Sequence, residues 1–547
     1  MAKKKPPIDP LDGPQIVLAG DIVAMDDALT VVRDGRMYID KGSIVAIRRA
    51  TDPVPAGFEA VAVVSTGGTL FPGLIELHNH LAYNALRLWK VPKKYTNRDQ
   101  WGGIPEYRKL VSGPMTVVGK SPGLLPALIR YVEAKCLVSG VTTSQGIALF
   151  SNAGIRRFYR GIVRNVEDTD EADLPEVETR IADVEAKDAT KFLARLKRET
   201  CFLLHLSEGL DAKARDHFLA LNIASNQWAI TPQLTGIHCA GLKPEDFAVL
   251  GSLGGAMVWS PLSNLLLYGG TANIAAAIAA NVRIGIGSDW SPSGSKNLLG
   301  ELKVAWLVAQ QIGGLAKHDI IAMATRTAAK ILGWSAAVGT LEPGKRADLL
   351  VVKGTSADPY DQLIRAKESD ISLVVINGIP RFGRKPLMTA LNATGESLTI
   401  DGEARMVFLK QDTQDPLVGA IKLSQAMDTL TDALSRLPAL AKELEKPKPV
   451  SIIGKARAPV TWQLALDELE DTGVDLRPRL PSKRGGGLTG PARHAVAAKA
   501  AQPLSTILQP LKLDPLTVAD DPDFLPSLAT QKNLPQFVKD GLPGLYV

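Results

Sequence analysis

The chain of 547 residues is 45% hydrophobic and 22% charged, which is ordinary for a globular protein and long enough for more than one domain. Its 63 basic and 57 acidic residues leave a net charge of +6, carried by small scattered groups such as Lys93-Lys94 and Lys483-Arg484. A nucleic-acid-binding protein would show a continuous basic stripe with interleaved aromatic residues, so we expect no nucleic-acid partner.

Cysteine content and apolar runs indicate the compartment. Three cysteines, Cys136, Cys201 and Cys239, lie far apart and are odd in number, which argues against a disulfide framework and suits a reducing environment. The N-terminus has no apolar stretch of signal-peptide length, and no run is long enough to span a membrane. We therefore expect a cytoplasmic protein without a membrane partner.

Residues 1–69 are expected to form the N-terminal part of a small β-sandwich domain. Short apolar runs bounded by glycine or aspartate turns predict strands at residues 15–19, 22–25, 36–39 and 43–47. From this β-domain the chain enters a different kind of segment at residue 70.

The run Leu70-Phe71-Pro72-Gly73-Leu74-Ile75 predicts a strand that is buried on both faces. It is followed directly by Glu76-Leu77-His78-Asn79-His80. Residues two apart in a strand point the same way, so His78 and His80 would project side by side. Two imidazoles held in this way can bind one metal ion, although an isolated His-x-His pattern also arises by chance.

A stretch rich in tryptophan, tyrosine and proline follows at residues 89–101. Its position directly after a strand end suits a segment that covers a pocket. It suits a packed surface loop equally well, and the sequence leaves both interpretations open.

Strands and helices then alternate over roughly 250 residues, which is the pattern of a (β/α)8 TIM-like barrel. We assign residues 70–335 to this barrel and count seven strands in it, ending with the run at residues 282–287. The eighth strand should fall between Arg164 and Cys201, but no run there identifies it, and residues 176–199 have a charged, helical pattern.

Two further regions follow the barrel. Strands predicted at residues 347–352 and 373–378 would return to the β-sandwich domain, so residues 336–410 are expected to be its C-terminal part and the barrel an insertion within it. Residues 411–547 are predicted to be a helical and irregular extension. A leucine-rich helical stripe there, interrupted by Pro438, indicates a packing or dimer face, while residues 446–502 are rich in proline, glycine and charge.

Polar side chains end three more of the predicted barrel strands. His205 follows Phe202-Leu203-Leu204, His238 follows Leu234-Thr235-Gly236-Ile237, and Asp289 follows residues 282–288. The C-terminal ends of barrel strands converge on one pocket. The chain has only seven histidines, and the other three, His217, His318 and His494, are predicted on helices or in the extension. Four histidines and one aspartate at matching strand ends predict a metal site.

The same segments resemble the amidohydrolase superfamily, in the branch that contains cytosine deaminase and chlorohydrolases. The resemblance spans about residues 15–382 and rests on six patterns in a fixed order. These are Pro72-Gly73-Leu74-Ile75-Glu76-Leu77-His78-Asn79-His80, His205-Leu206-Ser207-Glu208, Gly236-Ile237-His238-Cys239, Ser260-Pro261-Leu262-Ser263-Asn264, Gly287-Ser288-Asp289, and Gly339-Thr340-Leu341-Glu342-Pro343-Gly344-Lys345-Arg346-Ala347-Asp348-Leu349.

The resemblance implies that His78, His80, His205 and Asp289 bind one divalent metal ion, zinc or iron. It further implies that Asp289 takes the proton from a water molecule activated by the metal, that Glu208 carries a proton to the substrate nitrogen, and that His238 polarises the attacked centre. Asn264 is expected to fix its own turn. No lysine stands at a clear strand end between Arg164 and Cys201, so nothing indicates the carboxylated lysine of two-metal members.

The expected activity is hydrolysis of a non-peptide carbon–nitrogen bond in a small-molecule substrate, by an enzyme that forms a homo-oligomer. Deamination of a heterocyclic amine and opening of a cyclic amide both fit, with Glu208 and His238 favouring deamination. Hydrolytic dehalogenation of a heterocycle and a catalytically inactive scaffold stay open as alternatives. Three segments differ from common members of the superfamily and leave the substrate open. They are Trp290-Ser291-Pro292-Ser293, the loop at 89–101 and the C-terminal extension.

Overall fold

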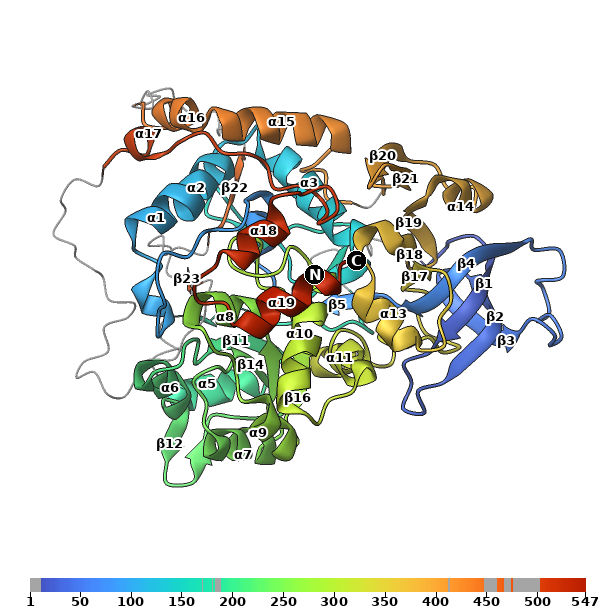
Figure 1. Ribbon diagram of the computed structural model, residues 1–547, viewed down its shortest axis with the longest axis horizontal. Coiled ribbons are helices and arrows are strands. Elements are labelled where there is room, and N and C mark those ends of the chain that lie inside the picture. Colours follow the sequence, from blue (N-terminus) through green and yellow to red (C-terminus); the bar gives the residue numbers. More distant parts are fainter. Residues whose placement is uncertain are drawn as a thin grey trace.

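The structure is a computed structural model that describes residues 11–169, 171–179, 181–182, 188–411, 414–446, 460–466, 474–475 and 502–547 (Figure 1). Most of the region predicted to be irregular, including His494, lies outside these residues. Among the helices of the described residues, none combines the length and the apolar character needed to cross a bilayer.

One sheet of nine strands combines segments from both sides of the predicted barrel. Its hydrogen-bonded order is β20-β21-β19-β18-β17-β4-β1-β2-β3. The strands are β1 (Ile16–Val23), β2 (Val31–Asp40), β3 (Ser43–Arg49), β4 (Val63–Pro72), β17 (Leu349–Lys353), β18 (Ile371–Ile376), β19 (Ile379–Arg384), β20 (Glu396–Ile400) and β21 (Glu403–Val407). The junction is the antiparallel pair of β4 and β17, in which Leu70 faces Val351. The predicted β-sandwich thus takes the form of one continuous sheet, at the right of Figure 1.

The run predicted as one strand before His78 is divided between two sheets. β4 ends at Pro72 in the nine-stranded sheet, and β5 (Leu74–Glu76) belongs to a parallel sheet. Gly73 separates them, and a Cβ atom at this position would collide with the side chain of Thr142. The single strand predicted here was wrong because the apolar pattern is the same in both sheets, whereas the break depends on this close approach.

Seven parallel strands correspond to the seven predicted barrel strands. They form a three-stranded sheet, β5-β6-β9, and a four-stranded sheet, β11-β14-β15-β16. Their bounds, after β5, are β6 (Val141–Ser144), β9 (Arg164–Asn165), β11 (Phe202–Leu206), β14 (Leu234–His238), β15 (Ala256–Trp259) and β16 (Arg283–Ile286). The helices between and after them are α3 (Leu125–Val138), α5 (Ala189–Leu196), α6 (Ala212–Leu219), α7 (Pro244–Ser252), α8 (Pro261–Tyr268), α9 (Ile274–Ala279) and α10 (Leu298–Ile312).

Backbone hydrogen bonds join these two parallel sheets at both edges. At one edge, Val177 N donates to Val166 O at 2.8 Å, and Glu178 N donates to Cys201 O at 3.1 Å. At the other edge, Leu77 N donates to Ile286 O at 3.3 Å. The helical prediction for residues 176–199 was therefore wrong at its start, since Glu178 makes a parallel bridge with Phe202. Helix α5 begins only after Asp188, whose carboxylate accepts from Thr190 N and Lys191 N.

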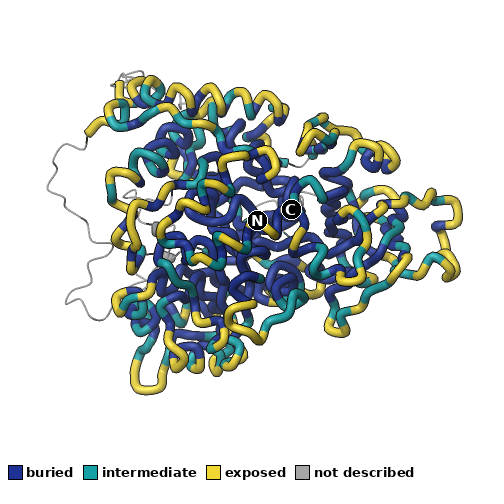
Figure 2. Tube along the Cα trace, in the orientation of Figure 1, coloured by how far each residue is buried: buried dark blue, intermediate teal, exposed yellow. Residues whose placement is uncertain are grey.

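The leucine stripe of the C-terminal extension is a packing face within this chain. Helices α15 (Leu423–Ser435) and α16 (Leu437–Leu444) bury Leu430, Leu434 and Leu437 in the main core, and α15 packs on α3. Pro438 lies in the first turn of α16, where its missing N–H has no partner to lose. Figure 2 shows the two helices as a half-exposed layer over the buried interior.

Short elements complete the described residues. Strand β22 (Trp462–Leu464) of the extension pairs with β7 (Ala148–Ser151), which pairs with β8 (Arg156–Phe158). Helix α19 (Gln536–Gly544) packs on α10. The others are η1 (Leu81–Ala85), η2 (Arg98–Gln100), α1 (Pro105–Tyr107), η3 (Arg108–Ser112), α2 (Gly113–Lys120), β10 (Ile181–Ala182), β12 (Asn222–Ala224), β13 (Gln227–Trp228), α11 (Lys317–Met323), α12 (Arg326–Leu332), α13 (Pro359–Arg365), η4 (Glu368–Asp370), α14 (Lys385–Ala390), β23 (Val474–Asp475), α17 (Leu504–Ile507) and α18 (Phe524–Ala529).

Candidate active site

Four histidines and one aspartate from four segments meet at the C-terminal ends of the parallel strands. The ring centroid of His78 lies 4.9 Å from that of His80, 4.8 Å from that of His205 and 5.1 Å from that of His238. Asp289 Oδ1 lies 3.1 Å from His78 Nε2 and 3.5 Å from His80 Nε2. The structure therefore brings all five predicted groups into one cluster, while His217 and His318 lie apart on α6 and α11.

The backbone at these strand ends is held in an uncommon conformation. His238 has a φ of 71° and Asp289 a φ of 66°, and Ser207, which follows the second ligand-bearing strand, has a φ of 53°. Non-glycine residues in this left-handed region are strained and gather at functional sites. Here the strain accompanies side chains that turn from the strand ends toward a common centre.

Two neutral side chains orient the histidine rings. His78 Nδ1 lies 3.1 Å from Gln145 Oε1, and His238 Nδ1 lies 2.9 Å from Asn264 Oδ1. An amide oxygen can only accept, so each Nδ1 carries a proton, and Nε2 is the nitrogen with a free lone pair when the ring is neutral. Asp289 is held similarly, because Ser263 Oγ donates to its Oδ2 at 2.6 Å.

Burial and neighbouring charges keep most of the cluster in the protonation state that a metal ligand needs. Burial, reinforced by the charge of His78, lowers the pKa of His80 to about 3 and lowers the pKa of His205 well below its ordinary value. Burial also lowers the pKa of His238. Although burial opposes both shifts, the mutual attraction of Asp289 and His78 lowers the pKa of Asp289 and raises the pKa of His78. Neutral imidazoles and an ionised carboxylate are the forms that bind metals.

The donor atoms fit a divalent cation. One group of ligand atoms combines His78, His80 and Asp289, and another combines His78, His205 and His238, each with its atoms within 4.8 Å of one another. The Nε2 atoms of His205 and His238 are buried without a hydrogen-bond partner, and Nε2 of His78 faces Asp289 outside hydrogen-bonding geometry. Buried polar atoms without partners are unfavourable, and a cation among them would satisfy all three.

Glu208 stands beside the cluster and is held by two side chains. Arg98 Nη1 lies 2.9 Å from Glu208 Oε2, and the Tyr268 hydroxyl donates to Glu208 Oε1 at 2.9 Å. The same carboxylate lies 3.9 Å from His238 Nε2. This geometry is consistent with the predicted place of Glu208 beside the histidines, and its ion pair with Arg98 is buried.

The loop at 89–101 contacts the site and is also packed, so the two interpretations that its sequence allows do not exclude each other. Besides the Arg98 ion pair, Arg98 N donates to Glu208 O at 3.2 Å. Trp101 Nε1 donates to the Tyr268 hydroxyl at 3.0 Å, and its ring lies 6.0 Å from that of Trp290. The loop is therefore both packed and part of the site.

Sequence reasoning missed the residues that support the ligands. The assignment of Asn264 to its own turn was wrong, because its side chain contacts His238. Gln145 directly follows the end of β6, so the rule that identified the histidines, a polar residue at a strand end, could have found it. No local signal marks Arg98 or Tyr268, whose partner Glu208 is distant in sequence.

Two cavities meet at His205. The narrower one is bordered by Arg98, Glu208 and Lys213. The wider one lies over His80 and has a largely apolar wall with a buried carboxylate, Glu167. Its lining residues are Asn79, His80, Leu81, Ala82, Tyr83, Gln145, Gly146, Ile147, Ala148, Phe158, Glu167, Thr179, Leu203, His205, Ile237, Leu464 and Ala465. Leu464 and Ala465 come from the C-terminal extension, so the extension forms part of this wall.

Comparison with known proteins finds one family model and several deaminases. The Amidohydrolase family model matches residues 229–380. A 5-methylthioadenosine/S-adenosylhomocysteine deaminase of Moorella thermoacetica is 27% identical over 390 residues, covering 64% of this chain and 88% of the relative. The guanine deaminase of Escherichia coli is 29% identical over 205 residues, covering 36% of this chain and 46% of that enzyme.

Solved structures show the same fold. A zinc-bound adenosine deaminase from Xanthomonas campestris superposes with a TM-score of 0.55 at 17% identity, covering 78% of this chain and 99% of that one. A mutant atrazine chlorohydrolase of Arthrobacter aurescens, complexed with zinc and atraton, superposes with a TM-score of 0.52 at 20% identity, covering 67% of this chain and 94% of that one. The family-model match and the deaminase relatives support the amidohydrolase superfamily for this chain, as a hydrolase of carbon–nitrogen bonds other than peptide bonds.

Proposed function

We propose that the protein is a metal-dependent deaminase that removes an exocyclic amino group from a small nitrogen heterocycle. The observation that carries this proposal is the buried carboxylate of Glu208, 3.9 Å from His238 Nε2 and beside the cluster of metal-binding side chains. Hydrolytic deamination forms a carbon–oxygen bond, breaks the carbon–nitrogen bond, consumes one water and releases ammonia. The departing nitrogen needs a proton at the moment the bond breaks, and a carboxyl group at this position can deliver it.

His78, His80, His205 and Asp289 would hold a single divalent ion, zinc or iron. Such an ion supplies a Lewis acid that lowers the pKa of a coordinated water to near neutrality. Gln145 and Ser263 would keep His78 and Asp289 in place, since groups behind metal ligands fix their orientation. The segment of Val177, Glu178 and Thr179, which lies where the eighth strand is expected, contains no lysine and supports the choice of one metal over two.

The protein's own groups would handle the protons. Asp289 would accept a proton from the attacking water, and Glu208 would carry it to the leaving nitrogen. Arg98 and Tyr268 would keep Glu208 aimed at the reacting atoms. His238, with its proton on Nδ1, presents an acceptor at Nε2, so the predicted polarisation of the attacked centre would require a second proton on that ring.

Relatives support deamination over the alternatives. The curated relatives that match most of their own length are named as deaminases of 5-methylthioadenosine and S-adenosylhomocysteine, which carry an exocyclic amine on a purine. Dehalogenation would release an anion that needs no proton and would leave Glu208 without this task. An inactive scaffold would have no need of a complete ligand set.

The architecture proposed for this function is a (β/α)8 barrel inserted in the nine-stranded β-domain. It is supported by seven parallel strands together with the extended residues Val177 and Glu178, which bond to both neighbouring segments. We further propose domain boundaries at 69, 335 and 410, a homo-oligomer and a cytoplasmic location.

The test is ammonia release by the zinc- or iron-loaded protein from a panel of heterocyclic amines, with lactams and N-acyl compounds as the competing classes. Glu208→Gln should lower kcat by about 100-fold or more, the range for loss of a general acid, while metal content stays at the wild-type level. Glu245→Gln, which changes an exposed glutamate that pairs with Arg215, is the matched control. Wild-type turnover by Glu208→Gln would remove the assignment, and lactam opening without ammonia release would replace the proposed reaction.

A further inference from the structure

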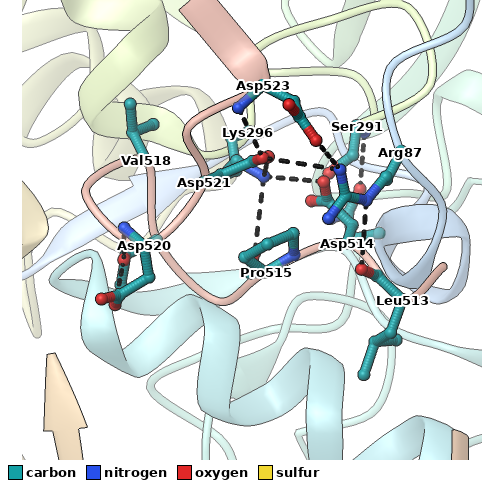
Figure 3. Close-up of polar contacts among 12 residues, drawn as sticks. Arg87, Ser291, Lys296, Leu513, Asp514, Pro515, Val518, Asp520, Asp521 and Asp523 are labelled. Atoms are coloured by element: carbon teal, nitrogen blue, oxygen red, sulfur yellow. Dashed lines mark hydrogen bonds and ion pairs between the residues drawn. The ribbon is translucent and has the colours of Figure 1, made fainter. Parts of the chain in front are cut away.

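Two lysines are buried between the barrel helices and the C-terminal segment 502–547. The side chains of Lys135, on α3, and Lys296 are 2% and 1% exposed, and both contact Asp514 of that segment. Lys296 Nζ lies 2.7 Å from Asp514 Oδ1 and 2.8 Å from Asp521 Oδ2, while Lys135 pairs with the other oxygen of Asp514. Figure 3 shows Asp514 and Asp521 approaching Lys296 from the same loop.

Lys135 also contacts two segments that carry metal-binding residues. Its Nζ donates to Asn84 O at 2.8 Å and to Ser291 Oγ at 3.0 Å. Asn84 lies in η1, which begins directly after His80, and Ser291 lies two residues after Asp289. The ammonium group of Lys135 therefore connects the segment that follows His80 with the segment that follows Asp289.

Asn84 continues this connection into the cluster. Its Oδ1 accepts from Ser291 N at 2.8 Å, and its Nδ2 donates to Asn79 Oδ1 at 2.9 Å. Asn79 stands between His78 and His80, and its own Nδ2 donates to Glu76 Oε2 at 2.8 Å. Each link is buried, so a change at one end is not absorbed by solvent.

The carboxylate of Asp514 stabilises the buried ammonium groups of Lys135 and Lys296. Burial lowers the pKa of Lys135 to about 8, and the charge of Asp514 opposes that shift. Burial alone would raise the pKa of Asp514, but the two ammonium groups lower it below its ordinary value. Without Asp514, the contacts among the described residues leave Asp521 as the one carboxylate that pairs with Lys296, and Lys135 keeps only neutral partners.

We propose that Asp514 is a positioning residue for the metal site, because it holds Lys135 where its ammonium group fixes Asn84 and Ser291 beside the ligands His80 and Asp289. This inference rests on the proposed metal site. It gives the C-terminal segment 502–547 a part in the enzyme's function.

Zinc titration of the purified full chain, in competition with a chromogenic chelator, tests the proposal. Asp514→Asn should bind zinc about tenfold more weakly, the lower end of the effect of losing an indirect support of a metal site. Asp523→Asn, which changes a 65%-exposed carboxylate paired with Arg87, is the control and should bind zinc like the wild type.

A double variant separates positioning from charge balance. Asp514→Asn with Lys135→Met leaves Lys296 paired with Asp521, so the melting temperature should recover, but the contacts to Asn84 and Ser291 stay lost and zinc affinity should stay about tenfold weaker. Recovery of zinc affinity in the double variant, or wild-type affinity in Asp514→Asn, would overturn the proposal.

Ser291→Ala covers the case in which Asp514→Asn does not fold. It removes one contact of Lys135 without changing any charge and should weaken zinc binding several-fold, whereas unchanged affinity would count against the proposal. Zinc affinity is measured without substrate. A wild-type protein that binds zinc but releases no ammonia would therefore refute the proposed reaction, while the zinc affinities of the variants would still test the role of Asp514.

Discussion

Gly287→Ala should disable the site through the backbone alone. A Cβ atom at Gly287 would lie 2.5 Å from both His78 N and His78 O and 2.6 Å from His78 Cβ. Ordinary contacts between such atoms are ~3.5–4.0 Å, so β16 would have to move about 1 Å away from His78. No side-chain rotation can relieve a collision with backbone atoms.

The displacement would act on the ligands directly. Asp289 N donates to His78 O at 3.0 Å, and His80 N donates to Asp289 O at 2.6 Å, so a shift of β16 stretches both bonds and separates Asp289 from the histidines. We expect a loss of stability of about 1–3 kcal/mol from overpacking. A misplacement of about 1 Å in a catalytic group is also expected to lower kcat/KM by about 100-fold.

Three measurements decide the outcome: zinc affinity by chelator competition, kcat/KM for ammonia release, and the melting temperature. Gly123→Ala is the matched control, because a Cβ atom there meets no neighbour within 4 Å and its backbone needs no left-handed conformation. If Gly287→Ala bound zinc and turned over substrate like Gly123→Ala, the close approach of β16 and His78 would not be what holds the site together.

Further variants test other parts of the argument. Burial raises the pKa of Glu301 from 4.5 to about 8, so the folded chain keeps a proton that the unfolded chain loses, and stability should fall as pH rises from about 4.5 to about 8, by up to ~5 kcal/mol. Unfolding free energies of Glu301→Gln should lack that decline, and parallel curves for the two proteins would contradict the assignment. Asn264→Ala should lower kcat by about 10–100-fold by releasing His238, and an unchanged kcat would show that the contact has no catalytic use. Ala465→Phe should raise KM with little change in kcat, because Ala465 lines the wider cavity and is not one of the proposed ligands, and an unchanged KM would place the substrate elsewhere.

Local sequence was sufficient to predict which polar side chains meet in the cluster. His78, His80, His205, His238 and Asp289 each end an apolar run, and parallel strands place their C-terminal ends at one edge regardless of the details of packing. The same reasoning identified seven of the parallel strands, since a buried strand must be apolar over several consecutive residues.

Tertiary contacts decided what the pattern could not show. Val177 and Glu178 join the parallel strands through backbone hydrogen bonds, which form whatever the polarity of the side chains. Because the surrounding residues are charged, the sequence pattern predicted a helix there instead of a strand. Arg98 reaches Glu208 across 110 residues and Asp514 reaches Lys135 across 379.

The sequence by itself thus determined the kind of chemistry, because metal binding depends on residue type and on position at a strand end. Only the tertiary structure decided how Glu208 is held, how Asn264 orients His238 and how the C-terminal segment braces the site. Those contacts join residues far apart in the chain, and periodicity within a window of ten or twenty residues contains no information about them.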